Sequence, residues 1–231
     1  MLTLTVIIPV FNEQNTVLKV VEKVKAVPII KEIIIVDDGS TDKTPILLES
    51  LRSDPDIRVI SHHKNMGRGA GIRTALAVAQ GYITIFQDAD LETSPSHYPM
   101  LIQPILDDEA DVVFGSRFLG KGLINGMGIH AYFANALLTQ LTSILFKSKL
   151  TDVLTMFQVT TTERLRNLNI ETDSWGSTIE ITAKLLKKKY RIVEIPVDYI
   201  PRRKDTGKKV RWSDFFGCLG ALIKYKFFYK A

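Results

Sequence analysis

The sequence predicts an α/β fold with a mainly parallel central sheet, helices on both faces and an amphipathic helix at the C-terminal end. Three observations lead to this prediction. Short runs rich in Val and Ile recur through the first half of the 231 residues, helical patterns separate them, and polar residues follow most of them. Strands that alternate with helices are joined by right-handed crossovers, which produce a parallel sheet covered on both faces.

Five apolar runs have the length and composition of buried strands. They lie at residues 4–10, 32–36, 57–61, 82–87 and 112–116. Helices are expected between the first four runs, at residues 15–26, 41–52 and 67–80. In the first of these helices, Val17, Leu18, Val21 and Val24 fall on one face, as in a helix that packs on a sheet.

The second half of the chain contains longer helical patterns. Further elements are expected at residues 130–147 (helix), 175–189 (helix), 191–199 (strand), 201–211 (basic loop) and 212–229 (aromatic helix). No repeat or low-complexity linker divides the chain. We therefore predict one domain over residues 1–211, followed by an amphipathic helical extension over residues 212–231.

The composition is that of an ordinary globular protein. Hydrophobic residues make up 45% of the chain and charged residues 24%, which argues against disorder. The single cysteine, Cys218, excludes an internal disulfide and indicates a reducing compartment. No apolar run approaches the roughly 20 residues of a membrane-spanning helix, and the N-terminal run lacks the basic residues of a signal peptide. We expect a cytoplasmic protein.

Polar clusters follow four of the predicted strands. They are Pro9-Val-Phe11-Asn-Glu13, Asp37–Asp42, Asp88-Ala89-Asp90 and Gly115-Ser-Arg117. Because ligands bind beyond the carboxyl ends of parallel strands, we expect the four clusters to converge on one site. The net charge of +5 selects no partner by itself. The acidic strand ends would repel a nucleic-acid backbone, so no nucleic-acid partner is predicted.

Asp88 and Asp90 are the candidate metal ligands. Two carboxylates beside a buried strand need a compensating positive charge. Mg²⁺ or Mn²⁺ would supply that charge, because both ions prefer hard oxygen ligands and nucleotide phosphates can complete their coordination. A solvated acidic turn is the simpler alternative, which the other three clusters disfavour.

Asp37 and Asp38 precede a turn that can cap the following helix through Ser40 or Thr41. A cap does not require two aspartates, so one is expected to accept hydrogen bonds from a base or a ribose. The glycine-rich stretch of residues 65–71 lacks the spacing of a dinucleotide fingerprint. Gly67 would instead let the backbone approach a nucleotide, with Arg68 near a phosphate. Close helix packing is the alternative.

Arg117 is a candidate for binding a phosphate through two parallel hydrogen bonds. Near the C-terminus, a basic loop contains Arg202, Arg203, Lys208, Lys209 and Arg211. The helix that follows mixes Phe and Leu with Lys, a composition that suits binding at a membrane surface with the loop at anionic head groups. The alternative is a solvated loop and a helix packed on the core.

Taken together and in this order, the motifs resemble glycosyltransferase family 2. Within it, the branch of dolichol-phosphate mannose synthases and bacterial polyprenyl-phosphate glycosyltransferases is the most similar. The resemblance rests on Pro9-x-x-Asn12-Glu13, Val36–Asp42, Asn65-x-Gly67-x-Gly69, Asp88–Glu92, Gly115-Ser-Arg117, Thr151-Asp152, Glu180–Lys184 and Glu194-Ile-Pro196-x-x-Tyr199-x-x-Arg202 with Gly207-Lys-Lys.

The resemblance implies a GT-A (Rossmann-like) fold for residues 1–211 and inverting transfer of a sugar from a UDP- or GDP-sugar to a polyprenyl or dolichyl phosphate. The protein would then be peripherally associated with the cytoplasmic face of a membrane. Asp88 and Asp90 would hold the metal, with Glu92 where relatives often carry a metal-binding Gln. Arg117 and Arg202 would bind the acceptor phosphate. Donor binding would involve Pro9, Phe11, Glu13, Asp37, Asp38, Gly67, Arg68, Asp88 and Ala89.

The main alternative keeps the donor and changes the acceptor to a saccharide or protein hydroxyl in cell-envelope polysaccharide synthesis. Such an acceptor needs a carboxylate base, for which Asp152 is the candidate. Two departures from the lipid-phosphate relatives bear on this alternative. Residues 119–134 contain no arginine, and Thr155-Met-Phe-Gln158 replaces a Ser-Gly-Phe-Arg-like stretch of the mannose synthases. A nucleotide-sugar-binding protein without turnover is a further alternative, which Asp88, Asp90 and Arg117 argue against.

Overall fold

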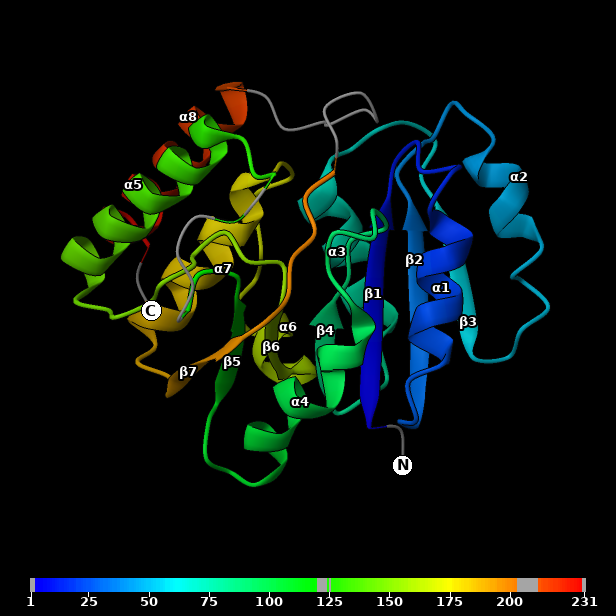
Figure 1. Ribbon diagram of the computed structural model, residues 1–231, viewed down its shortest axis with the longest axis horizontal. Coiled ribbons are helices and arrows are strands. Elements are labelled where there is room, and N and C mark those ends of the chain that lie inside the picture. Colours follow the sequence, from blue (N-terminus) through cyan, green and yellow to red (C-terminus); the bar gives the residue numbers. More distant parts are fainter. Residues whose placement is uncertain (1–2, 120–123, 125, 203–211, 230–231) are drawn as a thin grey trace.

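The computed structural model describes residues 3–119, 124, 126–202 and 212–229 (Figure 1). Most of the predicted basic loop, including Arg203, Lys208, Lys209 and Arg211, lies outside the described residues, as does Lys121.

Seven strands form one sheet in the order β3-β2-β1-β4-β6-β5-β7. Their bounds are Leu4–Val10 (β1), Lys31–Asp37 (β2), Ile57–Ser61 (β3), Ile83–Phe86 (β4), Val112–Ser116 (β5), Gln158–Thr161 (β6) and Ile192–Pro196 (β7). All neighbouring strands are parallel except β6, which is antiparallel to β4 and β5. The mainly parallel sheet was predicted. Strand β6 was not, because its sequence Gln-Val-Thr-Thr has a single aliphatic residue.

The helices are Val17–Lys25 (α1), Thr44–Glu49 (α2), Arg68–Val78 (α3), Tyr98–Leu106 (α4), Ile129–Phe146 (α5), Thr162–Arg166 (α6), Gly176–Lys187 (α7) and Trp212–Phe227 (α8), with a short 3₁₀ helix at Pro95–His97. Helices α4 and α6 were not predicted. In α4 two prolines obscure the helical pattern. Pro99 is tolerated because it lies in the first turn, where backbone N–H groups have no intrahelical partner.

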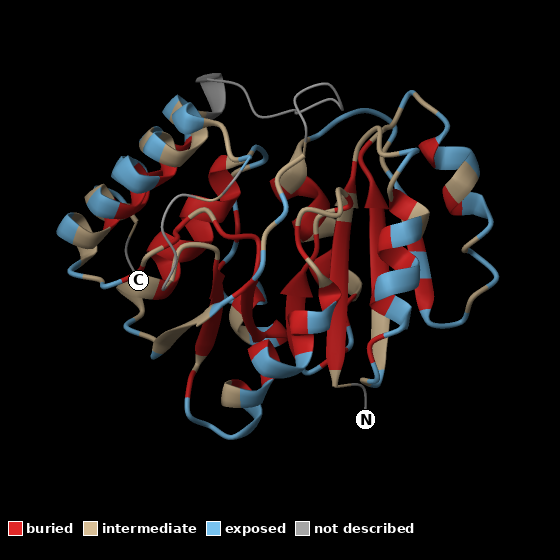
Figure 2. Ribbon diagram, in the orientation of Figure 1, coloured by how far each residue is buried: buried red, intermediate tan, exposed pale blue. Residues whose placement is uncertain are grey.

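The sheet separates two hydrophobic cores. Along β1, Leu4, Val6 and Ile8 face a core that includes α1 and α4, whereas Ile7 faces a core that includes α3, α5, α7 and α8. The alternation follows from the side-chain geometry of a strand. Figure 2 shows the buried strands enclosed by helices whose outer faces are exposed.

The C-terminal helix α8 lies beside α5 and α7 (Figure 1). One of its faces is part of the core and buries Cys218, Ala221, Leu222 and Tyr225. The other face exposes apolar side chains, with Phe216 at 66% and Phe227 at 64%. Core packing therefore accounts for one face, and membrane binding by the other stays a prediction. None of the described helices has the length and hydropathy required to span a membrane.

Candidate active site

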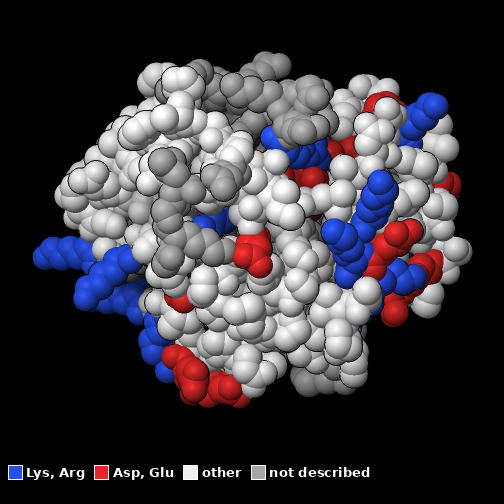
Figure 3. Space-filling view, viewed as in Figure 1, with Lys and Arg blue, Asp and Glu red and all other residues white. Residues whose placement is uncertain are grey.

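Residues that follow β1, β3, β4 and β5 meet at the carboxyl end of the sheet. Four charged side chains are close enough to shift the pKa of Asp88 electrostatically, and they follow different strands. They are Arg68, Glu92, Arg117 and Glu13. Figure 3 shows acidic and basic side chains next to each other at this upper edge of the molecule. The predicted clusters after β1, β4 and β5 therefore converge, and the Asp37–Asp42 cluster joins the one after β1 through the hydrogen bond from Asn12 N–H to Ser40 Oγ at 2.9 Å.

Nearby basic side chains compensate the carboxylates of Asp88 and Asp90 poorly, so both groups favour the protonated form when no cation is bound. Burial raises the pKa of Asp88, and burial together with repulsion from Asp88 raises the pKa of Asp90 to about 8. The nearest basic atom to Asp88 is Arg68 Nε, 3.9 Å from Oδ1, which is too far for a hydrogen bond. A cation bound between these carboxylates would remove the charge imbalance.

The carboxylate oxygens of Asp88 and Asp90 suit a divalent ion that is also coordinated by oxygens of a bound ligand. Among the described residues, no group of three or more His, Cys, Asp or Glu side chains is arranged to hold an ion alone. Asp88 and Asp90 would therefore supply two carboxylates, and oxygens of a diphosphate would complete the shell. Hard oxygen ligands of this kind suit Mg²⁺ or Mn²⁺.

Glu92 has a different role in this geometry from the metal ligand that the sequence suggested. Its Oε2 accepts a hydrogen bond from the Tyr199 hydroxyl at 2.6 Å, and its Oε1 accepts one from the Arg202 backbone N–H at 2.8 Å. Burial and the bond to Glu92 raise the pKa of Tyr199, which keeps the hydroxyl protonated. Since both oxygens are engaged, Glu92 positions Tyr199 and Arg202.

Arg202 connects the ends of β1 and β4. Its Nη2 donates to Glu13 Oε2 at 2.5 Å, and its Nε donates to the Asp90 carbonyl oxygen at 3.1 Å. Burial lowers the pKa of Arg202, but the hydrogen bond to Glu13 and the attraction of Asp90, Glu13 and Glu92 together outweigh it, and the net pKa is raised. Arg202 therefore stays charged beside Asp90.

Arg117 is held in place by Asp152. Its Nε and Nη2 donate to the two oxygens of Asp152 at 2.7 and 2.8 Å, and its backbone N–H donates to Oδ2 at 3.1 Å. Burial lowers the pKa of Arg117, but the paired carboxylate of Asp152 outweighs it and raises the net pKa. The guanidinium also lies over the Tyr199 ring, 5.2 Å from its centroid.

Asp152 is unsuited to the role of general base that the sequence left open for it. The side chain is fully buried, and Oδ1 accepts a second hydrogen bond from Asn135 Nδ2 at 2.9 Å. Both carboxylate oxygens are occupied by hydrogen bonds within the protein, so neither is open to the hydroxyl of an acceptor. Its role is to orient Arg117.

Glu194 supports the same arrangement from β7. It accepts hydrogen bonds from the backbone N–H groups of Thr151 and Asp152, at 2.8 and 3.1 Å. No role was predicted for Glu194, although a Glu between Val193 and Ile195 in a predicted strand is a signal for a buried polar contact.

Asp38 organises the glycine-rich turn. Its Oδ1 accepts a hydrogen bond from Met66 N–H and its Oδ2 accepts one from Gly67 N–H, both at 2.8 Å, and His62 Nδ1 lies 2.8 Å from Oδ1. Asp37 accepts one hydrogen bond, from Ser40 N–H at 3.0 Å. Of the two aspartates, Asp37 is therefore the better candidate for recognising a nucleoside.

The glycines of this turn allow close packing on residues 172–173. Gly67 has a φ of 95°, and a Cβ there would lie 2.5 Å from the Asp173 carbonyl oxygen. A Cβ at Gly69 would lie 1.9 Å from the Thr172 carbonyl oxygen. No larger residue fits at these positions. Close packing, the alternative in the sequence analysis, accounts for both glycines.

Arg68 projects from this turn toward Asp88. Its guanidinium lies near the rings of Phe86 and Trp175, at 5.9 and 5.4 Å from their centroids, and Nη1 donates to Thr178 Oγ1 at 3.3 Å. Its buried Nε has no hydrogen-bond partner among the described residues. Burial lowers the pKa of Arg68. The Arg68 Nε–H group is therefore available to donate a hydrogen bond to a phosphate oxygen. Sequence reasoning missed Trp175 and Thr178.

The three remaining donor-site candidates are near these groups. Pro9 lies in β1 beside Gly71, where an added Cβ would come within 3.6 Å of the Pro9 Cβ. Ala89 is buried between the two aspartates, and Phe11 is half-buried after β1. Their contribution to donor binding stays a prediction.

Comparisons with known proteins identify the family of this chain. The family model described as Glycosyl transferase family 2 matches residues 5–163. Glycosyltransferase AglD of Haloferax volcanii is 27% identical over 213 residues, which cover 86% of this chain and 33% of the relative. A dodecaprenyl-phosphate galacturonate synthase of Rhizobium johnstonii is 30% identical over 149 residues, covering 62% of this chain and 44% of the relative. The chain thus matches less than half of either relative.

A solved structure has the same fold. Glucosyl-3-phosphoglycerate synthase from Mycobacterium tuberculosis, crystallised with Mn²⁺, UDP and phosphoglyceric acid, superposes with a TM-score of 0.76. The comparison covers 99% of this chain and 80% of the synthase at 20% sequence identity.

Proposed function

The chain belongs to glycosyltransferase family 2 and has the GT-A fold, and from this premise we propose that it moves a sugar from a nucleoside-diphosphate sugar to a polyprenyl phosphate at a membrane surface. One observation carries the proposal. Two charged arginines, Arg117 and Arg202, border the Asp88–Asp90 pair and are held there by Asp152 and Glu13. An anionic acceptor beside an acidic, metal-dependent donor site needs such cations.

The donor half of the proposal assigns the acidic pair to a metal and the neighbouring residues to the nucleotide. Asp88 and Asp90 would hold Mg²⁺ or Mn²⁺, which when bound stabilises negative charge on the leaving diphosphate. Arg68 would donate to a phosphate oxygen, and Asp37 would accept a hydrogen bond from the nucleoside. The M. tuberculosis synthase has been crystallised with UDP and either ion, which supports this assignment.

The acceptor half rests on the arginines. A phosphate monoester is already anionic at neutral pH, so its oxygen can attack the sugar without a general base. Arg117 and Arg202 would orient that oxygen for attack from the side opposite the leaving diphosphate, which inverts the anomeric centre. The occupied oxygens of Asp152 agree with a mechanism that needs no base. The name of the Rhizobium relative, a dodecaprenyl-phosphate galacturonate synthase, supports this acceptor class.

The membrane surface is proposed at α5 and α8. These adjacent helices expose Phe133 and Ile144 from α5 and Phe216 and Phe227 from α8, each more than 60% exposed. Lys147 and Lys149 are exposed where α5 ends. Apolar side chains with nearby lysines suit the interface of an anionic bilayer. The protein would then act at the cytoplasmic face of the membrane as a peripheral enzyme.

A transfer assay tests the proposal. Radiolabelled UDP- and GDP-sugars are incubated with polyprenyl phosphate and Mg²⁺, Mn²⁺ or EDTA. We expect metal-dependent label in the organic phase. Label found only in free sugar, or only in an added saccharide, would contradict the lipid-phosphate acceptor.

A further inference from the structure

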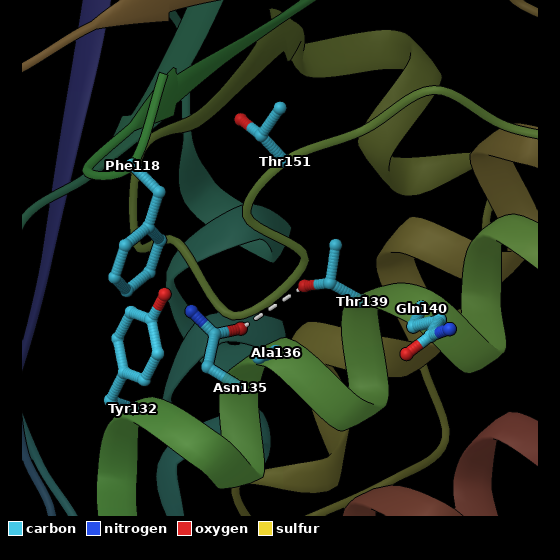
Figure 4. A pocket seen from close by; sticks show the side chains of 7 residues that line it. All are labelled: Phe118, Tyr132, Asn135, Ala136, Thr139, Gln140 and Thr151. Carbon is cyan, nitrogen blue, oxygen red and sulfur yellow. Dashed lines mark hydrogen bonds between the residues drawn. The ribbon is translucent and has the colours of Figure 1, made fainter. Parts of the chain in front are cut away.

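A cavity of about 250 Å³ lies beside Arg117, between α5 and the segments that follow β5 and precede β6. Figure 4 shows the seven described side chains that line it: Phe118, Tyr132, Asn135, Ala136, Thr139, Gln140 and Thr151. None of the seven is charged. The cavity is smaller than the roughly 300–1,000 Å³ of sites that bury a whole drug-sized ligand. It therefore suits one uncharged part of a longer molecule.

Most polar atoms in the cavity wall are already hydrogen-bonded within the protein. Asn135 donates to Asp152, and its Oδ1 accepts from Thr139 Oγ1 at 3.3 Å, the bond drawn in Figure 4. Thr151 Oγ1 lies 2.7 Å from Ser116 Oγ and donates to Glu194 Oε2 at 3.0 Å. The side chains of Tyr132 and Gln140 are the remaining polar groups.

The wall is therefore mainly apolar toward a ligand. The Phe118 and Tyr132 rings pack edge to face, with centroids 5.7 Å apart and an angle of 70° between their planes. The methyl groups of Ala136, Thr139 and Thr151 add aliphatic surface. A sugar would need hydrogen bonds that most of these groups already make to each other. A hydrocarbon needs none.

The cavity also lies next to the expected position of the acceptor phosphate. Phe118 follows Arg117 in the chain, and the guanidinium carbon is 5.6 Å from the centre of the Phe118 ring. On the opposite wall, Asn135 binds the same Asp152 that holds Arg117. A phosphate bound at Arg117 would thus place the carbon attached to its ester oxygen near the cavity.

We propose that this cavity binds the isoprene unit nearest the phosphate of the acceptor lipid and selects for its branched, unsaturated carbon skeleton. The proposal rests on the proposed function and adds a site for the lipid chain itself. Two aromatic rings and three methyl groups provide close contacts for a methyl-branched chain. The rest of the chain would leave along α5, where the exposed side chains of Phe133 and Leu137 continue the apolar surface.

The experiment compares farnesyl phosphate with dodecyl phosphate as acceptors. Their main chains are equally long, and only farnesyl phosphate carries methyl branches and double bonds. For the unmodified protein we expect kcat/KM to be about tenfold or more higher with farnesyl phosphate, the range that methyl-sized differences produce in apolar pockets.

Two variants fill the cavity by different amounts. Ala136 is exposed at the cavity mouth, so larger side chains are accommodated without disturbing the core. Ala136→Leu should raise the acceptor KM for farnesyl phosphate moderately, and Ala136→Phe should raise it about tenfold and remove the preference over dodecyl phosphate. The donor KM should not change in either variant. Ala134→Phe is the matched control, because Ala134 is on the same helix and does not line the cavity.

The outcomes separate this proposal from the proposed function. Transfer to both acceptors with the preference unchanged in Ala136→Phe would overturn the cavity assignment and leave the proposed function in place. Equal kcat/KM values for the two acceptors with the unmodified protein would also overturn the cavity assignment and leave the proposed function in place. Absence of transfer to any lipid phosphate, with donor turnover intact, would overturn the proposed function and this proposal together.

Discussion

The proposed donor and acceptor halves of the site differ in how their charges are balanced. On the donor side, Asp88 and Asp90 lie close together and their pKa values are raised by burial. On the acceptor side, Arg117 is paired with Asp152, and Glu194 accepts hydrogen bonds from three donor groups of Thr151 and Asp152. The donor side therefore requires charge from a ligand, whereas the acceptor side is assembled before any ligand binds.

This difference has an energetic consequence. Removing a carboxylate from the donor side relieves repulsion, so it should abolish activity without a loss of stability. Removing one from the acceptor side leaves a buried guanidinium without its partner, which costs stability as well as activity. The predictions below test this contrast.

The largest effect is expected at Asp90. Asp90→Ala should lower kcat for transfer by about two to three orders of magnitude, the scale on which an electrostatic catalytic group acts. The midpoint of urea unfolding in EDTA should be unchanged or higher. Asp111→Ala is the control, because Asp111 pairs with Arg164 and Arg191 at the opposite end of β5. Near-normal transfer by Asp90→Ala would refute the metal assignment.

Substitution of Asp152 should lower stability as well as activity, unlike substitution of Asp90. Asp152→Asn keeps the shape but removes the charge that orients Arg117, so we expect the acceptor KM to rise about tenfold while the donor KM stays constant. The free energy of unfolding should fall by about 3 kcal/mol, as for other broken buried ion pairs. Steady-state kinetics and urea denaturation measure both. A raised donor KM would mean that the two halves are not independent.

A smaller effect on the donor side is expected from Glu180 and Lys184 of α7. Both side chains are fully buried and lie 2.6 Å apart, and Glu180 accepts hydrogen bonds from Glu171 and Thr172 N–H at 2.8 Å. The adjoining Asp173 carbonyl accepts Gly69 N–H at 2.6 Å. The Glu180–Lys184 pair thus positions residues 171–173, and these residues in turn hold the glycine-rich turn.

Glu180→Gln should raise the donor KM by about threefold to tenfold with the acceptor KM unchanged. In the double variant Glu180→Gln/Lys184→Met neither side chain is charged, so stability should partly recover relative to Glu180→Gln. Isothermal titration with UDP gives donor affinity independently of turnover. If the acceptor KM changed by the same factor, the pair would have only a general structural role.

A further prediction concerns the pH dependence of stability. The pKa of Asp90 in the folded protein is about 8, above its ordinary value of 3.8. Folding therefore favours the protonated carboxyl, and this contribution is complete at low pH and is lost as the pH rises through 8. In EDTA, the free energy of unfolding should contain a component that decreases between about pH 4 and pH 8 and is absent in Asp90→Asn. An identical pH profile for both proteins would contradict the raised pKa.

The proximity of the groups in the proposed donor half was largely predictable because these groups follow successive strands. Asp88, Asp90 and Arg68 lie within one turn of a strand or helix end, so the strand pattern was enough to bring them together. Asp38 shows where this reasoning stops. Its hydrogen bonds reach residues 28 and 29 positions away and hold the glycine-rich turn, a role that no local pattern predicts.

The sequence by itself determined the α/β class, the convergence of polar strand ends and, within the described residues, six of the seven strands and six of the eight helices. These features depend on hydrophobic periodicity and turn residues, which are local. Tertiary structure alone decided the antiparallel position of β6 and the roles of Glu92, Asp152 and Glu194. The bond between Arg202 and Glu13 joins residues 189 positions apart. Such roles depend on which oxygen atoms remain available after folding, and that depends on distant partners that no local pattern specifies.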